Sequence, residues 1–487
     1  MKRSVLSMFG EAFHEATTCG GACRRSRHRV DPAQARITAM ADLSSSVAEL
    51  SKSFSGRLLL PKDSDWDTAR RVHNGLVDKR PALIAQCLGA ADITAAVRLA
   101  REHSLEIAVR GGGHNVSGRA TVDGGLMIDL SALKYVHADP KARTARAGGG
   151  TLWGHFNRET QAHGLATTGG VVSTTGVAGL TLGGGIGWLM PKFGMALDNL
   201  LGVEIVLADG HIVRADDDEN PDLFWAVRGG GGNFGVVSSL EFRLHEVGPL
   251  VTGGIVAWPA KRARETLRLF RDFAERATDE VMLVAALMTA PDGATKVSAI
   301  AAGYFGPSAI AERVVKPIKV FDQPVVDTLG PIPYEQLNAS LDASFPRGAR
   351  NYWKSHFCEQ LTDEAIETII DCHRKCPSPM AMVSIEHFHG AATRVKTAKT
   401  AFALRGRGFN VLALSQWSSP AGDAAGLGWA RETDAALKPS AGRVNTSTTS
   451  TRTTPALPPS PRRMDRMSSG YSRSRPGTTR TTYSTAT

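Results

Sequence analysis

The spacing of hydrophobic residues predicts a strand, a helix and a second strand early in the chain. The apolar run PALIAQCL (81–88) has the character of a strand, and ADITAAVRLAREHS (91–104) carries apolar residues at helical spacing. A second strand-like run, LEIAVR (105–110), follows directly. Three such elements within roughly thirty residues are typical of a βαβ unit. Upstream, residues 46–77 are predicted to be helical and then extended.

Shorter elements are predicted downstream of this unit. Strand-like runs are GLMIDLS, YVHADP and TARAGGG, and a helix fits residues 151–164. The segment 198–215 predicts a hairpin with an Asp209–Gly210 turn. Residues 221–247 predict a helix, a glycine loop and a strand.

The pattern changes near Pro249. Over 250–440, amphipathic helices alternate with strand-like runs such as VMLVAALMTA, KVSAIAAGYF, MAMVSIEHFHG and FNVLALSQW. That alternation predicts a second domain in which helices back a sheet. The sequence therefore favours an α+β protein with one domain over 41–248 and another over 249–440.

The predicted fold is organised around residues 105–131, LEIAVRGGGHNVSGRATVDGGLMIDLS. Three glycines follow a strand and precede His114, and such a turn can direct several N–H groups at an anion such as a pyrophosphate. The imidazole of His114 could serve as a base, a metal ligand or a covalent attachment point. The simplest alternative is a glycine-rich hairpin with a solvated histidine.

Two further glycine-rich loops occur at 176–187 and 229–232. None of the three has the strand-to-helix G-x-G-x-x-G context of a nicotinamide-binding fold, and the chain has no G-x-x-x-x-G-K-[ST] motif. A dinucleotide held by several loops is the simpler interpretation.

Charge argues against a nucleic-acid partner. The 487 residues carry a net charge of +10, of which +4 lies in residues 1–40 and +6 in residues 446–487. The part between these ends is electroneutral, whereas a nucleic-acid-binding domain would carry a basic face. No apolar run reaches the length of a membrane span, and residues 1–40 lack the apolar core of a secretory signal, so we expect a cytoplasmic protein with no membrane partner.

The six cysteines do not predict a metal site. Four of them form two C-x-x-x-C pairs, which is not the usual zinc spacing. Reduced, structural thiols fit a cytoplasmic location.

Both ends of the chain are predicted to lie outside the fold. Residues 1–40 contain an arginine cluster and are predicted to be a disordered leader. Residues 441–487 are predicted to be an aberrant tail, because 20 of the last 42 residues are Ser or Thr and seven are Arg. Codons can be chosen for Arg462–Tyr483 so that a shifted frame encodes AYGPNVERLQPLKARYDPDNL, and we interpret the tail as an out-of-frame translation that begins near Asn445.

Five segments of the chain stand out as motifs: AVRGGGHNVSG, DLS, GWLMPKFGMALDN, PDLFWAVRGGGGNFGVV and LSQW. Together they resemble the motifs of the flavin-linked oxidases of the vanillyl-alcohol-oxidase/PCMH type, and within them the berberine-bridge-enzyme-like family. The resemblance covers about residues 55–445, and the shifted tail peptide also resembles this family.

This resemblance implies a PCMH-type FAD-binding domain and a substrate domain with an antiparallel sheet backed by helices. His114 occupies the position of the histidine that bonds the 8α carbon of the flavin. Many relatives add a cysteinyl bond, but Val172 stands at that position here, in VSTTG. The resemblance therefore implies FAD with one covalent link.

Other site residues carry over by position. The implied cofactor-binding residues are Arg110, Gly111, Gly112, Gly113, His114, Asn115, Gly118, Val172, Thr175, Gly176, Gly179, Leu180, Gly183, Gly184, Gly185, Gly187, Val236 and Val237. On the substrate side, Gln416 matches a substrate-facing position, Tyr352 and Trp353 could line the cavity or pack in the core, and Asn445 marks where relatives often place a base.

The implied function is an FAD-dependent oxidoreductase that moves hydride from a C–H bond beside O or N to flavin N5. Molecular oxygen or another acceptor would reoxidise the flavin. Two alternatives stay open at this point: a flavin-binding protein impaired by the altered C-terminus, and a zinc or nucleic-acid binder, which the neutral body and the cysteine spacing oppose.

Overall fold

A computed structural model describes residues 42–440. The predicted leader, the predicted tail and Asn445 lie outside the described residues. The chain forms two compact units, residues 1–48 and 49–487. In the first unit the structure describes the helical residues 42–48, and all the elements named below belong to the second.

The predicted βαβ unit is present in a four-stranded sheet with the order β1-β2-β4-β3. Helix α3 (Ala90–Glu102) connects β2 (Leu83–Gln86) to β3 (Ile107–Arg110), and these bounds agree with the predicted segments. Strand β4 (Leu126–Asp129) lies between them and is parallel to both. The short β1 (Arg57–Leu59) pairs with β2, and the one-turn helix α2 (Trp66–Ala69) follows it.

A five-stranded antiparallel sheet follows, with the order β5-β6-β10-β8-β9. It contains the predicted hairpin, now seen as β8 (Leu200–Val206) and β9 (Ile212–Asp216), and Gly210 in the turn has a φ of +84°. The other strands are β5 (Val136–Asp139), β6 (Thr144–Gly148) and β10 (Val236–Arg243). Aromatic residues from the helices α4 (Trp153–Gln161) and α7 (Pro221–Val227) fill the core beneath this sheet.

Several short elements lie in the connections between the strands of these two sheets. They are α5 (Val177–Gly183), α6 (Met190–Phe193), and the two-residue strands β7 (Leu165–Ala166) and β11 (His245–Glu246), which pair with each other.

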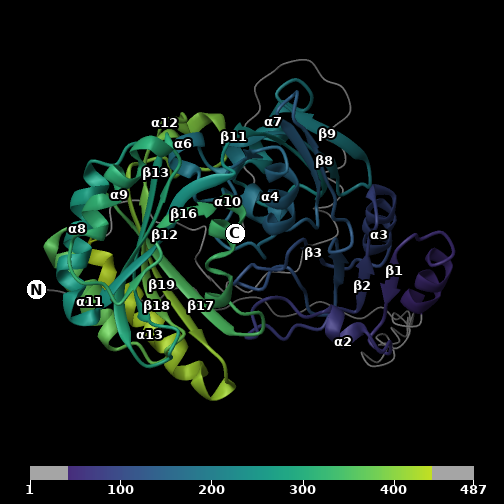
Figure 1. The fold of residues 1–487 in the computed structure, drawn as a ribbon. Coiled ribbons are helices and arrows are strands. Elements are labelled where there is room, and N and C mark those ends of the chain that lie inside the picture. Colours follow the sequence, from purple (N-terminus) through teal and green to yellow (C-terminus); the bar gives the residue numbers. More distant parts are fainter. Residues whose placement is uncertain (1–41, 441–487) are drawn as a thin grey trace, which may run out of the picture. The chain divides into compact units, whose positions relative to one another are not determined.

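The strands after Pro249 form an eight-stranded antiparallel sheet, with helices on one of its faces, as the sequence predicts (Figure 1). The strand order is β15 (Val326–Asp327), β12 (Leu250–Pro259), β14 (Lys296–Tyr304), β13 (Val281–Thr289), β18 (Met382–Phe388), β19 (Gly408–Trp417) and β17 (Arg350–Cys358), with β16 (Gly330–Pro333) also paired to β12. The covering helices are α8 (Ala263–Glu275), α9 (Ala311–Lys319), α11 (Asp363–Arg374) and α13 (Asp423–Leu437). The shorter α10 (Tyr334–Ala339) and α12 (Ala391–Arg394) lie in connections.

The two faces of this sheet differ in what covers them. Residues of odd number on β13, β18 and β19 join the main hydrophobic core with the four helices. Successive side chains of a strand point to opposite faces, so the residues of even number on these strands point away from the helices. We call this second surface the open face. On this face several side chains of β13 and β17 are only half-buried, as are Glu386 of β18 and Asn410 of β19, whereas the other β18 and β19 residues of this face are buried.

Among residues 42–440, no helix has the length and apolar character that a bilayer crossing requires.

Candidate functional site

His114 lies in the loop that follows β3 and contacts residues from two distant segments. Its Nε2 lies 2.9 Å from Oγ1 of Thr174. Its ring stacks on the ring of His73, with 3.8 Å between the ring centroids. Burial, together with the nearby charges of His73 and Arg347, lowers the pKa of His114 to about 3. The imidazole is therefore neutral at physiological pH and keeps a free electron pair.

The backbone before His114 presents four N–H groups in a row. Within the described part of the chain, the N–H groups of Gly111, Gly112, Gly113 and His114 have no hydrogen-bond acceptor. Buried or half-buried backbone donors in folded proteins normally find a partner. A run of consecutive free N–H groups at a glycine turn is the arrangement that binds phosphate oxygens.

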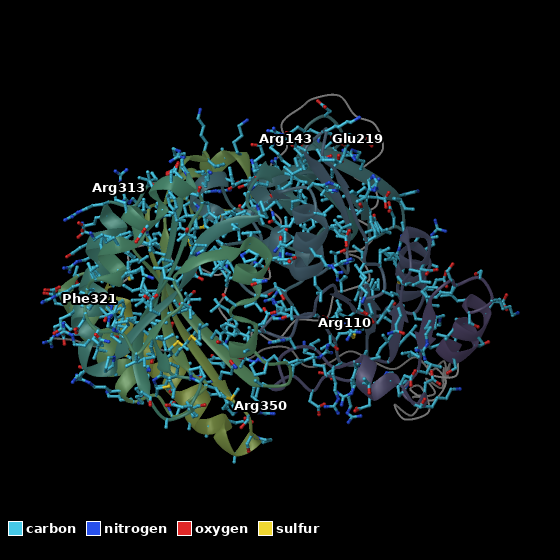
Figure 2. All side chains as sticks on the ribbon, in the orientation of Figure 1. Arg110, Arg143, Glu219, Arg313, Phe321 and Arg350 are labelled. Atoms are coloured by element: carbon cyan, nitrogen blue, oxygen red, sulfur yellow. The ribbon has the colours of Figure 1, made fainter. Side chains whose placement is uncertain are left out.

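Arg110, labelled in Figure 2, is the last residue of β3 and directly precedes this loop. Its guanidinium donates to both carboxylate oxygens of Asp129, at 2.8 and 2.5 Å, and to the carbonyl oxygens of Ala69 and Arg71. Both charged side chains are buried. Because its donors are engaged by the protein, Arg110 fixes the strand end from which the free N–H groups project.

Two of the three predicted glycine loops meet at this point. A Cβ added to Gly112 would lie 2.4 Å from the backbone nitrogen of Gly176, and one added to Gly176 would lie equally close to the nitrogen of Gly112. Only residues without a side chain allow two backbones this close. The third loop packs at the end of α5, where the N–H groups of Gly229 and Gly231 donate to the carbonyl of Leu182.

The remaining glycines of the predicted set fall into two groups. Gly184, Gly185 and Gly187 are packed against protein atoms; a Cβ on Gly187, for example, would lie 1.6 Å from the carbonyl oxygen of Gly169. In contrast, a Cβ on Gly179 or Gly183 of α5 would meet nothing within 4 Å. These two glycines present bare backbone to open space.

Other predicted cofactor residues lie around the same loops. Gly118 has a φ of +71° and packs on Val77, and Leu180 of α5 packs against the core of the five-stranded sheet. Val172 is buried, and its carbonyl accepts from the N–H of Thr175. Asn115 is exposed, and its Oδ1 accepts hydrogen bonds from Ser117 and from the N–H of Arg119. Val236 and Val237 are buried at the start of β10.

The substrate-side candidates separate onto two faces of the large sheet. Gln416 points to the open face; its Nε2 donates to the carbonyl of Ser344 at 3.2 Å, and its Oε1 is buried without a partner among the described residues. Trp353 lies on the same face, against Phe345. Tyr352 points the other way, packs on the helix-covered core and lies under Arg431 of α13. The structure therefore separates Tyr352 from Gln416 and favours a packing role for it.

Three contributors to the site were not predicted from the sequence. His73 and Thr174 contact the His114 ring, and Asp129 binds Arg110. They lie 41, 60 and 19 positions from their partners, and nothing in their local patterns distinguishes them. The motif DLS did include Asp129, but only as part of a family resemblance.

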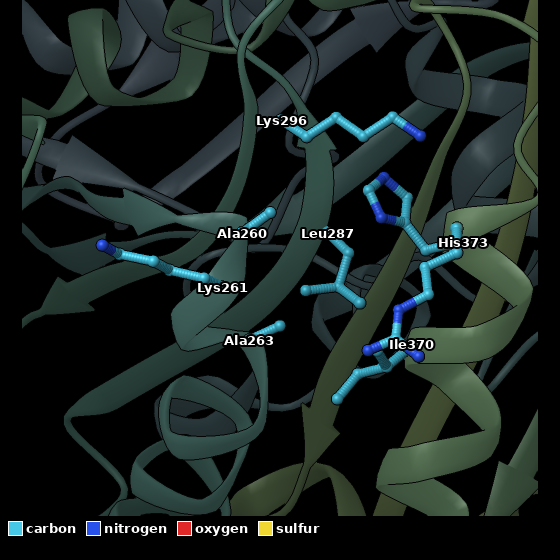
Figure 3. Close-up of a pocket in the computed structure, with 8 residues that line it drawn as sticks. Ala260, Lys261, Ala263, Leu287, Lys296, Ile370 and His373 are labelled. Atoms are coloured by element: carbon cyan, nitrogen blue, oxygen red, sulfur yellow. The ribbon is translucent and has the colours of Figure 1, made fainter.

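A separate cavity of about 230 Å³ lies on the helix-covered side of the large sheet (Figure 3). Its lining includes Leu287 of β13, Lys296 of β14 and His373 of α11. These residues are on the opposite side of the sheet from Gln416, so this cavity is not part of the candidate site. Within residues 42–440, no group of three or more His, Cys, Asp or Glu could hold a metal ion.

Comparisons with known proteins identify FAD-dependent relatives of this chain. A family model described as an FAD binding domain matches residues 81–216. The (R)-6-hydroxynicotine oxidase of Paenarthrobacter nicotinovorans is 34% identical over 391 residues, which is 79% of this chain and 85% of that protein.

Solved structures show the same similarity. The crystal structure of 6-hydroxy-D-nicotine oxidase from Arthrobacter nicotinovorans superposes with a TM-score of 0.75 at 32% identity, over 82% of this chain and 90% of that one. A glucooligosaccharide oxidase from Acremonium strictum, described as carrying a 6-S-cysteinyl, 8α-N1-histidyl FAD, gives 0.71 at 25% identity, over 81% and 86% of the two chains.

Proposed function

The chain belongs to the PCMH-type FAD-linked oxidases, the family that includes 6-hydroxynicotine oxidase, glucooligosaccharide oxidase and the berberine-bridge-enzyme-like proteins, and on that basis we propose how its residues hold FAD and a substrate. It is an FAD-dependent oxidoreductase, and the resemblance predicted from the sequence is confirmed. We propose that it oxidises a small molecule at a C–H bond beside oxygen or nitrogen, with molecular oxygen as the acceptor.

The observation that carries the cofactor proposal is the run of free N–H groups from Gly111 to His114. These donors fit the pyrophosphate of FAD, which supplies the acceptor oxygens that the protein lacks there. The open space beside Gly179 and Gly183 fits the close approach of a flat or anionic group to the backbone. When bound, FAD supplies the hydride-accepting ring, and the protein supplies position and electrostatics.

His114 is the residue that we propose as the covalent attachment point. Bond formation to an electrophilic carbon needs a neutral imidazole, and the pKa of His114, lowered to about 3 by burial and the charges of His73 and Arg347, keeps the ring neutral. Because Nε2 is held by Thr174 at 2.9 Å, Nδ1 is the nitrogen left for the bond. Val172 has no sulfur, so the proposal includes one covalent link and no cysteinyl link.

Gln416 is our candidate for holding the substrate. Its Oε1 is a buried acceptor without a partner in the described residues, and leaving such an atom unpaired is costly unless a ligand satisfies it. A substrate O–H or N–H would supply the missing donor. The hydrogen bond from Nε2 to the carbonyl of Ser344 fixes the orientation of the amide and leaves Oε1 as the atom for the substrate.

Two measurements on the purified protein test this proposal. If His114 carries the flavin, acid-precipitated protein stays yellow and the tryptic peptide that contains His114 has the mass of the peptide plus one flavin. Anaerobic addition of alcohols, sugars and amines then bleaches the flavin, and air restores the colour. A colourless pellet refutes the covalent link. A yellow protein that no substrate reduces indicates the flavin-binding protein without activity, and a flavin attached through a thioether contradicts the single link.

A further inference from the structure

One carboxylate on the open face has no positive partner. Glu386 of β18 accepts a hydrogen bond from Nδ2 of Asn410 on β19 at 2.8 Å. It makes no ion pair with any described residue. By contrast, the buried Asp198 side chain binds the buried Arg405 through both oxygens.

The surroundings of Glu386 are apolar. In register across the sheet, Val284 of β13 lies on one side of it, and Phe357 of β17 lies beyond Asn410 on the other. Burial raises the pKa of Glu386, while the Asn410 hydrogen bond opposes that rise. Glu386 is nevertheless only half-buried, so part of the residue is open to solvent.

The position of Glu386 links it to both halves of the candidate site. Val284, its register partner, packs in the cluster that contains Ile186 and Trp188, which follow the glycine run after α5. Ser384 and Met382 precede Glu386 on β18 and lie on the same face, and Met382 packs with Leu414 and Trp353; we call these three apolar side chains the apolar wall. Glu386 therefore lies between the predicted cofactor segment and the apolar wall, which ends near Gln416.

A half-buried carboxylate without a cation is unfavourable unless a ligand compensates its charge. We propose that Glu386, positioned by Asn410, binds the positively charged nitrogen of an amine substrate whose hydrocarbon part lies on the apolar wall of the open face. This inference rests on the proposed function and selects amines with an apolar or aromatic body from the broader class of small molecules. Sugars, which are neutral and polar, fit this wall poorly.

The test compares ligand binding by the flavin-containing protein and its Glu386→Gln variant. Benzylamine and phenethylamine, with benzyl alcohol and phenethyl alcohol as their neutral counterparts, are titrated anaerobically while the flavin absorbance is followed. For the wild-type protein, we expect each amine to bind about 10- to 100-fold more tightly than its alcohol, the size of a hydrogen bond to a charged group. The Glu386→Gln variant should lose this preference, with alcohol affinity unchanged.

Control variants separate charge recognition from structural damage. Glu359→Gln removes the same charge at an exposed position after β17 and should keep the full amine preference. Glu386→Leu removes the charge with an apolar side chain of similar size and should also lose the preference, which excludes a local effect of the glutamine. Flavin content and Tm confirm that each variant is folded.

The outcomes distinguish this inference from the function on which it rests. A yellow wild-type protein that binds amines and alcohols equally overturns the role of Glu386 and leaves the oxidase intact. A Glu386→Gln variant that keeps the preference overturns it as well. A protein without flavin overturns the proposed function and this inference together.

Discussion

Replacement of Asp129 by asparagine tests whether the Arg110–Asp129 pair holds the cofactor loop. The carboxylate accepts two hydrogen bonds from Arg110, and it also accepts from the N–H and hydroxyl of Ser131 and from Gln86. Asparagine keeps the shape but leaves the buried guanidinium without a compensating charge. Removal of one partner from a buried ion pair typically costs about 3–5 kcal/mol, and the full burial of Asp129 places this pair in that class.

Thermal unfolding measures the effect. At about 2 °C per kcal/mol for a chain of this size, we expect Asp129→Asn to lower Tm by roughly 5–10 °C. The flavin content of the purified variant should fall too, because the four free N–H groups project from the strand end that Arg110 fixes. Asp65→Asn is a matched control, since Asp65 pairs with Arg57 at 2.6 Å in an exposed position and its replacement should leave Tm unchanged.

The stabilisation by the Arg110–Asp129 pair should also depend on pH in a definite direction. Burial alone would raise the pKa of Asp129, but the hydrogen bond and charge of Arg110 outweigh it and lower the pKa below 3.8. A carboxyl with a lowered pKa in the folded state stabilises the fold fully above its unfolded pKa and loses that contribution as the pH falls through the folded pKa. The Tm difference between wild type and Asp129→Asn should therefore be constant from about pH 5 to 8 and shrink below about pH 4. A difference below about 1 kcal/mol at neutral pH, or one that grows in acid, would refute the reasoning.

Further predictions concern the residues around the loop. His114→Ala should yield protein whose flavin is released by acid, as measured by the absorbance of the supernatant, and a flavin retained in the pellet contradicts attachment at this residue. Gly179→Ala should leave the fold intact or raise its stability by about 0.5–1 kcal/mol, because the added methyl faces open space in a helix, yet reduce the ratio of flavin to protein. Gly112→Ala should instead lower the yield of folded protein, because its Cβ would lie 2.4 Å from the nitrogen of Gly176.

Local patterns were sufficient to predict much of the fold. Apolar spacing predicted α3 and its two flanking strands within two residues, and the Asp209–Gly210 turn predicted the β8–β9 hairpin. The sheet of β12–β19 was predicted as strands backed by helices because its strands are long and its helices strongly amphipathic. Each of these depends on neighbours in sequence, which a pattern can report.

Pairing over long distances could not be predicted in the same way. Strand β4 inserts between β2 and β3, a result that depends on which apolar edges meet in three dimensions. Tyr352 and Trp353 are adjacent and similar in type, yet they point to opposite faces of β17. Only the strand register distinguishes the substrate side from the core side, and one shift of register would exchange them.

The glycines show how a correct motif can combine different physical causes. The sequence assigned one role, proximity to the cofactor, to all of them. In the structure, Gly112 and Gly176 are required because two backbones touch, whereas Gly179 and Gly183 face open space. Gly112 and Gly176 allow the two loops to pack together, whereas Gly179 and Gly183 leave space beside α5.

Asn74 explains how the cofactor loop and the open face keep a fixed separation. Its buried amide donates to the carbonyl of Val116, just after His114, and to the carbonyl of Asn351 on β17, while its Oδ1 accepts from the N–H of Asn351. Asn351 is the register partner of Gln416 on β19. One side chain thus joins the segment that carries the proposed flavin link to the strand pair that presents the proposed substrate ligand. Because hydride transfer depends on the separation and alignment of two bound molecules, these three hydrogen bonds connect the position of the cofactor loop to the position of the substrate-side strands.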